Sequence, residues 1–163
     1  MTTKDNGQPI TRRGILSGMA ATAALGLSGE LCSEAAAAPL DDQTIKQLVV
    51  AVDDVPTSEF EWGTLKWMLS AEQSPGAEQT LGICQIFPGK GNPMHYHPNC
   101  EEVLYMIAGR GRHSLGDESV ELTPGMAIRI PKNVHHNLVN IGWETILCLV
   151  SFSSGNRQMV HVK

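Results

Sequence analysis

The sequence has few aromatic residues, no concentrated positive charge and no long helical pattern, and these absences narrow the possible folds and functions. Aromatic residues make up 5% of the 163-residue chain, against 16 glycines, which favours short strands and frequent turns over helices. The net charge is −5 and no run of Lys or Arg follows Lys46, which argues against nucleic-acid binding. No stretch after Leu48 keeps a helical period, and there is no internal repeat. We therefore expect one soluble domain with a single site.

The first 37 residues have the order of segments found in an export signal. A polar stretch ends at Arg12-Arg13, a mildly apolar run of Ala and Gly extends from Ile15 to Gly29, and small residues follow at 35–38. The paired arginines resemble the twin-arginine signal, and cleavage after Ala37 fits the A-x-A-like rule. The apolar run is shorter than the ~20 apolar residues of a spanning helix, so no membrane segment is expected in the mature protein.

This interpretation predicts export by the twin-arginine machinery and a periplasmic or extracellular location for the mature protein. The alternative is an Ala-rich leader that contains an arginine pair by chance. Three cysteines remain after the leader, Cys84, Cys100 and Cys148, and an odd number excludes a full disulfide framework. Cys84 and Cys148 lie in apolar runs and are expected to be small buried hydrophobes, although a bridge between them stays open.

Short apolar runs separated by turn residues indicate an all-β domain. Turn signals come roughly every 8 to 12 residues, as in a β-sandwich or barrel. The expected strands are residues 64–69, 81–87, 102–108, 113–115, 120–122, 127–130, 137–140 and 145–152. In the first of them, Leu65, Trp67 and Leu69 are expected to share one face.

Four residues have the types and spacing of metal ligands: His95, His97, Glu102 and His136. Side chains two residues apart point to the same face of a strand, so His95 and His97 are expected to face one centre. A carboxylate on the next strand and a third imidazole further along would complete the set. Three nitrogens and one anionic oxygen suit a divalent first-row metal, and an octahedral ion would keep two positions open for a small molecule.

These residues resemble the two motifs of the cupin family. Gly89, His95, His97, Glu102 and Gly109 match the first motif, GKGNPMHYHPNCEEVLYMIAG. The second motif is matched by Gly125, Pro131, His136 and Asn140, with Asn133 at a position that is usually Gly. Asn tolerates left-handed backbone better than most residues, so the turn is expected to survive. The resemblance spans about residues 81–152.

The resemblance implies an all-β fold, a cupin jelly-roll β-barrel with the metal inside its mouth, preceded by the cleavable signal segment. Residues 38–60 are then an N-terminal arm and residues 61–163 the barrel. Glu102 is expected to face inward, and Val103, Tyr105 and Ile107 outward. That apolar outer face needs a cover, either the segment before Leu65 or a second subunit. Because cupins commonly pair, we predict a homodimer.

Two further polar residues are candidates for proton transfer near the metal. His113 occupies a position where an apolar inward residue is expected, and it either reaches the cavity or faces the surface. Gln85 interrupts an apolar strand and either bonds a ligand or faces solvent. Cys100 lies in the loop that carries the ligands, where a bystander role is favoured.

The function predicted from these residues is a metal-dependent enzyme of the oxidoreductase type, similar to a dioxygenase, that acts on a small organic molecule. Mn or Fe is preferred over Ni, Cu or Zn, because a protein exported already folded would load its metal in the cytoplasm. One alternative is a non-redox isomerase, lyase or decarboxylase. The other is a non-catalytic module that binds a small ligand such as a sugar.

Overall fold

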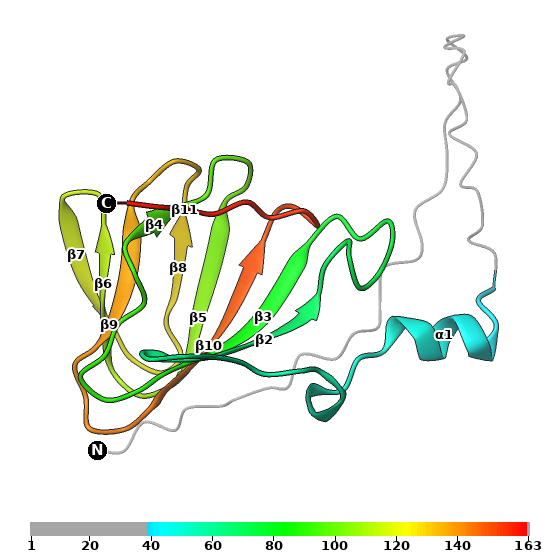
Figure 1. Cartoon of the computed structure of the whole chain (residues 1–163), viewed down its shortest axis with the longest axis horizontal. Helices are drawn as coiled ribbons and strands as arrows, with labels where there is room; N and C mark the ends of the chain where they lie inside the picture. Colours follow the sequence, from blue (N-terminus) through cyan, green and yellow to red (C-terminus); the bar gives the residue numbers. More distant parts are fainter. Residues whose placement is uncertain (1–38, 163) are drawn as a thin grey trace, which may run out of the picture. The chain divides into compact units, whose positions relative to one another are not determined.

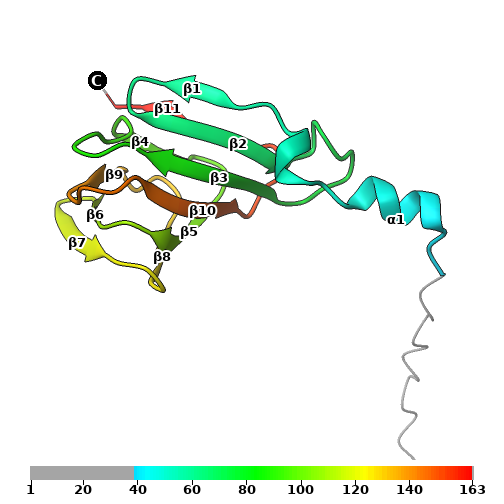
Figure 2. The same ribbon diagram turned by 90° about the horizontal axis from the view of Figure 1, so that it is seen from below.

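The computed structural model describes residues 39–162, and the predicted export signal lies outside them. Almost all regular structure is β-strand, in two antiparallel sheets whose strands surround a shared interior (Figures 1 and 2). One sheet has the order β1-β2-β3-β10-β5-β8, and the other has the order β11-β4-β9-β6-β7. The all-β barrel of two antiparallel sheets predicted from the sequence is confirmed.

The first sheet holds most of the long strands. Its members are β1 (Ser58–Phe60), β2 (Gly63–Leu69), β3 (Thr80–Ile86), β10 (Ile146–Phe152), β5 (Glu102–Ala108) and β8 (Ala127–Ile130). The second sheet consists of β11 (Val160–His161), β4 (His95–Tyr96), β9 (His136–Asn140), β6 (Gly111–Leu115) and β7 (Glu118–Leu122).

Alternation of side chains along the strands separates the interior from the surface. In β5, Leu104 and Met106 are buried together with Glu102, whereas Val103, Tyr105 and Ile107 are exposed, as the sequence predicts. The buried members of β3, β5, β9 and β10 form one apolar core. Glu102 and His136, the first residues of β5 and β9, are buried at the start of strands whose later buried members belong to this core.

Gly109 and Asn133, two turn residues of the motifs, have left-handed backbone conformations. Gly109 has a φ of 83°, and an added Cβ there would lie 2.8 Å from the Cα of Ile146, so no other residue fits without a shift. Asn133 has a φ of 63°, which confirms that Asn can replace Gly in this turn. Its backbone N–H donates to the carbonyl of His97, which ties the turn to a ligand.

The segment before the barrel contains structure that the strand pattern does not predict. Helix α1 (Asp42–Leu48) begins at Asp41, whose carboxylate accepts a hydrogen bond from the Thr44 N–H. A short 3₁₀ helix, η1 (Val52–Asp54), follows. Strand β1 then pairs with β2, so the first sheet starts at Ser58, inside the predicted arm. No helix in the described part of the chain is long and apolar enough to cross a membrane.

Strand β2 departs from the predicted alternation. The register of β2 against β3 shifts between Trp67 and Leu69, which displaces Leu69 from the face that Leu65 and Trp67 share. Leu65 and Trp67 face the interior cavity, whereas Leu69 lines a separate surface hollow. The expectation that all three share one face is therefore wrong at Leu69.

The three cysteines of the described residues are buried free thiols. Cys84 and Cys148 lie directly opposite each other on β3 and β10, and the Cys148 thiol donates to the carbonyl of Cys84 at 3.7 Å. Burial in the core agrees with the predicted role of both as small hydrophobes.

Candidate metal centre

The four predicted ligands meet where the two sheets face each other. His95 and His136 are register partners on β4 and β9 of one sheet, and Glu102 begins β5 of the other. His97 follows β4 directly. One donor atom from each of the four residues lies within 4.8 Å of the others, and all four side chains are buried. The spacing in the sequence therefore brings together one set of donors.

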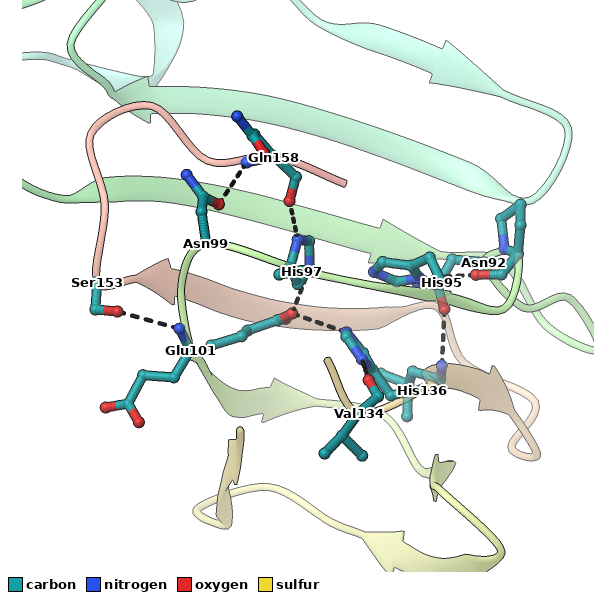
Figure 3. A network of polar contacts seen from close by, with 12 residues as sticks. Asn92, His95, His97, Asn99, Glu101, Val134, His136, Ser153 and Gln158 are labelled. Carbon is teal, nitrogen blue, oxygen red and sulfur yellow. Dashed lines mark hydrogen bonds and ion pairs between the residues drawn. The ribbon is translucent and has the colours of Figure 1, made fainter. Parts of the chain in front are cut away.

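Main-chain carbonyls fix the orientation of all three imidazoles (Figure 3). The Nδ1 atoms of His95, His97 and His136 lie 2.8, 2.6 and 2.8 Å from the carbonyl oxygens of Pro93, Gln158 and Val134. Because a carbonyl only accepts, each Nδ1 must carry the proton. The lone pair of each neutral ring is therefore on Nε2, as in histidines that bind metals.

Two of these Nε2 atoms lie next to the carboxylate of Glu102. Nε2 of His136 and Nε2 of His97 are 3.1 and 3.2 Å from the same oxygen, Oε2. The His136 contact is a hydrogen bond when the ring is protonated at Nε2 as well as at Nδ1, whereas Nε2 of His97 is buried without a hydrogen-bond partner. An unpartnered nitrogen beside a buried carboxylate is costly unless something else occupies the space between them.

The charges of the site depend on burial and on this contact. Burial alone raises the pKa of Glu102, but the hydrogen bond with His136 and the adjacent imidazole of His97 outweigh it and hold that pKa at about 2. Burial lowers the pKa of His136, but the carboxylate outweighs it and the net shift is upward. Burial and the nearby His136 lower the pKa of His95 to about 4. At neutral pH the site thus holds an anionic carboxylate and a neutral His95.

This donor set fits a divalent first-row metal. Three Nε2 lone pairs and one carboxylate converge in a buried space, and a cation there would satisfy the orphaned nitrogen of His97. Such an ion would also replace the proton shared by His136 and Glu102. The orienting carbonyls supply the outer contacts that metal-binding histidines require.

A cavity of about 370 Å³ leads to three of the four ligands, His95, His97 and Glu102. Its wall is largely apolar and aromatic; the other lining residues are Phe60, Trp62, Leu65, Trp67, Cys84, Asn92, Pro93, Val150, Phe152, Arg157, Met159 and His161. The volume lies in the range of small-molecule sites. A molecule in the cavity would therefore contact the ligands from one side.

The two residues proposed for proton transfer lie in different places. His113 is buried, its ring stacks on His136 with 5.9 Å between centroids, and it does not line the cavity. Its pKa is lowered to about 4 by burial and by His136. Gln85 is exposed on the outer face of β3, where its side chain accepts from Thr64. Of the two alternatives for Gln85, the structure has the one in which the side chain faces solvent, because the alternation of β3 points it outward.

Sequence reasoning missed Arg157 and most of the aromatic wall. Arg157 lies between β10 and β11, in a segment without periodicity or a motif, so no pattern indicated its side chain. Cys100 is buried outside both the ligand group and the cavity lining, in agreement with a bystander role.

Comparison with known proteins identifies the same region. The model of the cupin domain matches residues 82–152. Protein SchB of Streptomyces halstedii is 33% identical over 94 residues, which cover 58% of this chain and 68% of that protein. Germin-like protein 3-8 of Oryza sativa is 30% identical over 144 residues, which cover 83% of this chain and 62% of that protein.

Among solved structures, oxalate decarboxylase of Lactobacillus farciminis superposes with a TM-score of 0.63 and 24% identity. The match covers 68% of this chain but only 34% of the decarboxylase chain, so the likeness shows the fold alone. The matched model, the relatives and the buried site of three histidines and one glutamate agree with one another. The chain therefore belongs to the cupin family, through a single cupin domain.

Proposed function

We propose that this protein is an exported metalloenzyme that holds Mn or Fe at His95, His97, Glu102 and His136 and oxidises a small organic molecule. One observation carries the proposal: three imidazoles, each fixed by a main-chain carbonyl, turn their Nε2 atoms toward one buried carboxylate beside a cavity. When bound there, a redox-active metal supplies a Lewis acid and an electron-transfer centre with positions open to substrate and dioxygen.

The preference for Mn or Fe follows from the proposed export route. A site equilibrated outside the cytoplasm would favour Cu or Zn. The affinity of nitrogen and oxygen donors for divalent metals increases from Mn through Fe and Ni to Cu. The twin-arginine route moves folded proteins, so a barrel folded in the cytoplasm would carry its metal to the periplasm or beyond. Stoichiometric Cu or Zn in protein taken from its native compartment would overturn this preference.

The residues of the chain bind and orient the substrate and exclude water from it. The apolar wall of the cavity desolvates the substrate, and the carboxylate of Glu102 partly neutralises the charge of the site. His113 does not line the cavity, so it acts on the site through the ring of His136, which it stacks against. Glu102 is the only carboxylate among the lining residues, and His161 is the only lining imidazole outside the four predicted ligands, so few groups in the cavity can transfer a proton.

Two other functions give different results in the same assays. A non-redox isomerase, lyase or decarboxylase would form product under strict anaerobiosis. A binding module for a sugar or another small ligand would bind tightly without turnover. The scarcity of proton-transfer groups in the cavity favours the binding module as the second candidate.

Dioxygen consumption by metal-loaded protein tests the proposal. A panel of phenols, enols and organic acids would be screened with the parent protein and with His95→Ala, and folding would be checked by circular dichroism. We expect consumption by the parent and none by His95→Ala. Equal rates in both proteins, or product formation that does not need dioxygen, would contradict the proposed oxidase chemistry.

We further propose that the protein is a homodimer. Val103, Tyr105 and Ile107 remain about two-fifths exposed on the outer face of β5. Within residues 39–162, the segment before Leu65 leaves these side chains uncovered. Of the two covers expected from the sequence, that segment and a second subunit, the second subunit therefore remains. A second copy of the same face would bury these side chains.

A further inference from the structure

Arg157 differs from the other arginines that the structure describes. Arg110 and Arg112 pair with Glu121, and Arg129 pairs with Glu101, all on the surface. The side chain of Arg157 is partly buried, lines the cavity, and has no carboxylate within ion-pair distance among residues 39–162. The arginine with the least access to water is thus the one whose charge lacks a partner.

The guanidinium of Arg157 lies over two aromatic rings. Its central carbon lies 4.4 Å from the ring centroid of Trp67 and 5.0 Å from that of Phe152. Contacts to π-faces stabilise the cation but use none of its N–H groups. The planar fork of donors therefore stays free for an anion.

The backbone on both sides of Arg157 is tied to the metal-binding loop. The side chain of Asn99 donates to the carbonyl of Asn156 at 2.8 Å and accepts from the Gln158 N–H at 2.9 Å. The carbonyl of Gln158 is the acceptor for Nδ1 of His97 at 2.6 Å. Figure 3 shows this connection from Asn99 through Gln158 to His97. Arg157 is thereby positioned by the contacts that orient a metal ligand.

One aromatic ring separates Arg157 from the metal centre. The centroid of Phe152 lies 4.9 Å from that of His97 and 5.0 Å from the guanidinium carbon. Phe60 and Trp62 stack at 4.9 Å, and both line the same cavity. A ligand between these groups would have an anionic end at Arg157, a flat apolar body and a second end at the metal.

We propose that Arg157 is a specificity-determining residue that binds the carboxylate of a flat, apolar substrate whose other end carries an oxygen directed at the metal. This inference deepens the proposed function and rests on it, because it concerns the same cavity. An aromatic hydroxy acid has the required chemistry. A free carboxylate would accept two parallel N–H bonds from the guanidinium and remove the cost of its unpaired charge.

The test compares an anion with its uncharged isostere. Binding of 4-hydroxybenzoate and 4-hydroxybenzamide is measured by isothermal titration calorimetry at pH 7, on metal-loaded and on metal-free protein. Arg157→Met retains most of the apolar stem over Trp67 and Phe152, and Arg157→Lys retains the charge without the fork. Arg110→Met, which removes a surface arginine that does not line the cavity, is the matched control.

We expect the parent and Arg110→Met to bind the benzoate at least about tenfold more tightly than the benzamide. Arg157→Met should lose this preference while its affinity for the benzamide changes little, and Arg157→Lys should keep part of it. A role of Arg157 in packing alone would weaken both ligands equally. Absence of benzoate binding at millimolar concentration, an equal affinity for both ligands in the parent, or a preference that survives in Arg157→Met would overturn the proposal.

The metal-free measurement separates this inference from the proposed function. If the parent protein fails to bind added Mn or Fe but still prefers the benzoate, the result would support the role of Arg157 and contradict the metalloenzyme. Metal binding and turnover of neutral molecules, without that preference, would contradict only the role of Arg157. If Arg157→Met does not fold, the affinities of the parent and of Arg157→Lys for the benzoate and the benzamide still test the role of Arg157.

Discussion

Replacement of His113 by leucine should make the metal-free protein less sensitive to acid. His113 is 1% exposed, its Nδ1 lacks a hydrogen-bond partner, and its pKa is lowered from 6.5 to about 4 by burial and by the neighbouring His136. Between these two values the unfolded chain binds a proton at this position that the folded chain does not bind. Stability must therefore fall as the pH decreases from 6.5 toward 4.

The size of the effect follows from that difference in pKa. At pH 7 both states are nearly neutral at His113, so its ionisation contributes almost nothing. At pH 4.5 the unfolded state is protonated and the folded state mostly is not, which costs about 2 kcal/mol of the free energy of unfolding. Leucine removes this cost, so His113→Leu should gain about 2 kcal/mol relative to the parent between pH 7 and pH 4.5.

Urea unfolding of chelator-treated protein at the two pH values measures this difference. His135→Leu is the matched control, because His135 is the exposed histidine next to His136 in the sequence. His95, which also has a pKa of about 4, stays in every protein and cancels in the comparison. An equal loss of stability with acid in the parent and in His113→Leu would refute the reasoning.

Three further predictions concern a turn, a ligand and the outer face. Gly109→Ala should cost about 2 kcal/mol of the free energy of unfolding, because its φ is 83° and the new Cβ would meet Ile146; a urea-unfolding loss below about 0.5 kcal/mol would contradict this. Glu102→Gln should weaken Mn binding, measured by calorimetric titration. The loss should exceed the roughly 10- to 100-fold that removal of a residue bonded only to a metal ligand costs. An unchanged affinity would exclude Glu102 as a ligand. Val103→Glu should give monomers in size-exclusion chromatography with light scattering, whereas Val120→Glu, equally exposed on β7, should not; a dimer in Val103→Glu would place the interface elsewhere.

The barrel could be predicted because the residues resemble the two cupin motifs, and local rules agreed with the facing of the ligands. Period-2 alternation placed Glu102 and Met106 inside and Tyr105 outside, and two imidazoles two residues apart had to face one side. Asn133 could be assigned to a left-handed turn because the cupin motif usually has Gly at this position and Asn tolerates the same backbone. These features require no knowledge of which strands become neighbours.

Features that depend on distant contacts could not be predicted. The bulge that displaces Leu69 arises from the pairing of β2 with β3, and a two-residue strand such as β4 has no periodicity of its own. Gln85 is the polar residue in an otherwise apolar strand, and the register of β3 in the sheet decides which way its side chain points. Arg157 reaches the cavity from an irregular segment, and the rings beneath it come from β2 and β10. Tertiary packing alone brings these groups together.

Metal content is the measurement that tests the central claim most directly. Inductively coupled plasma mass spectrometry would be applied to protein purified from its native compartment, and to the His95→Ala/His136→Ala double variant with its fold checked by circular dichroism. We expect stoichiometric Mn or Fe in the parent and none in the variant. Metal-free parent protein that also fails to bind added Mn or Fe would contradict the metal centre and leave a barrel that only binds ligands.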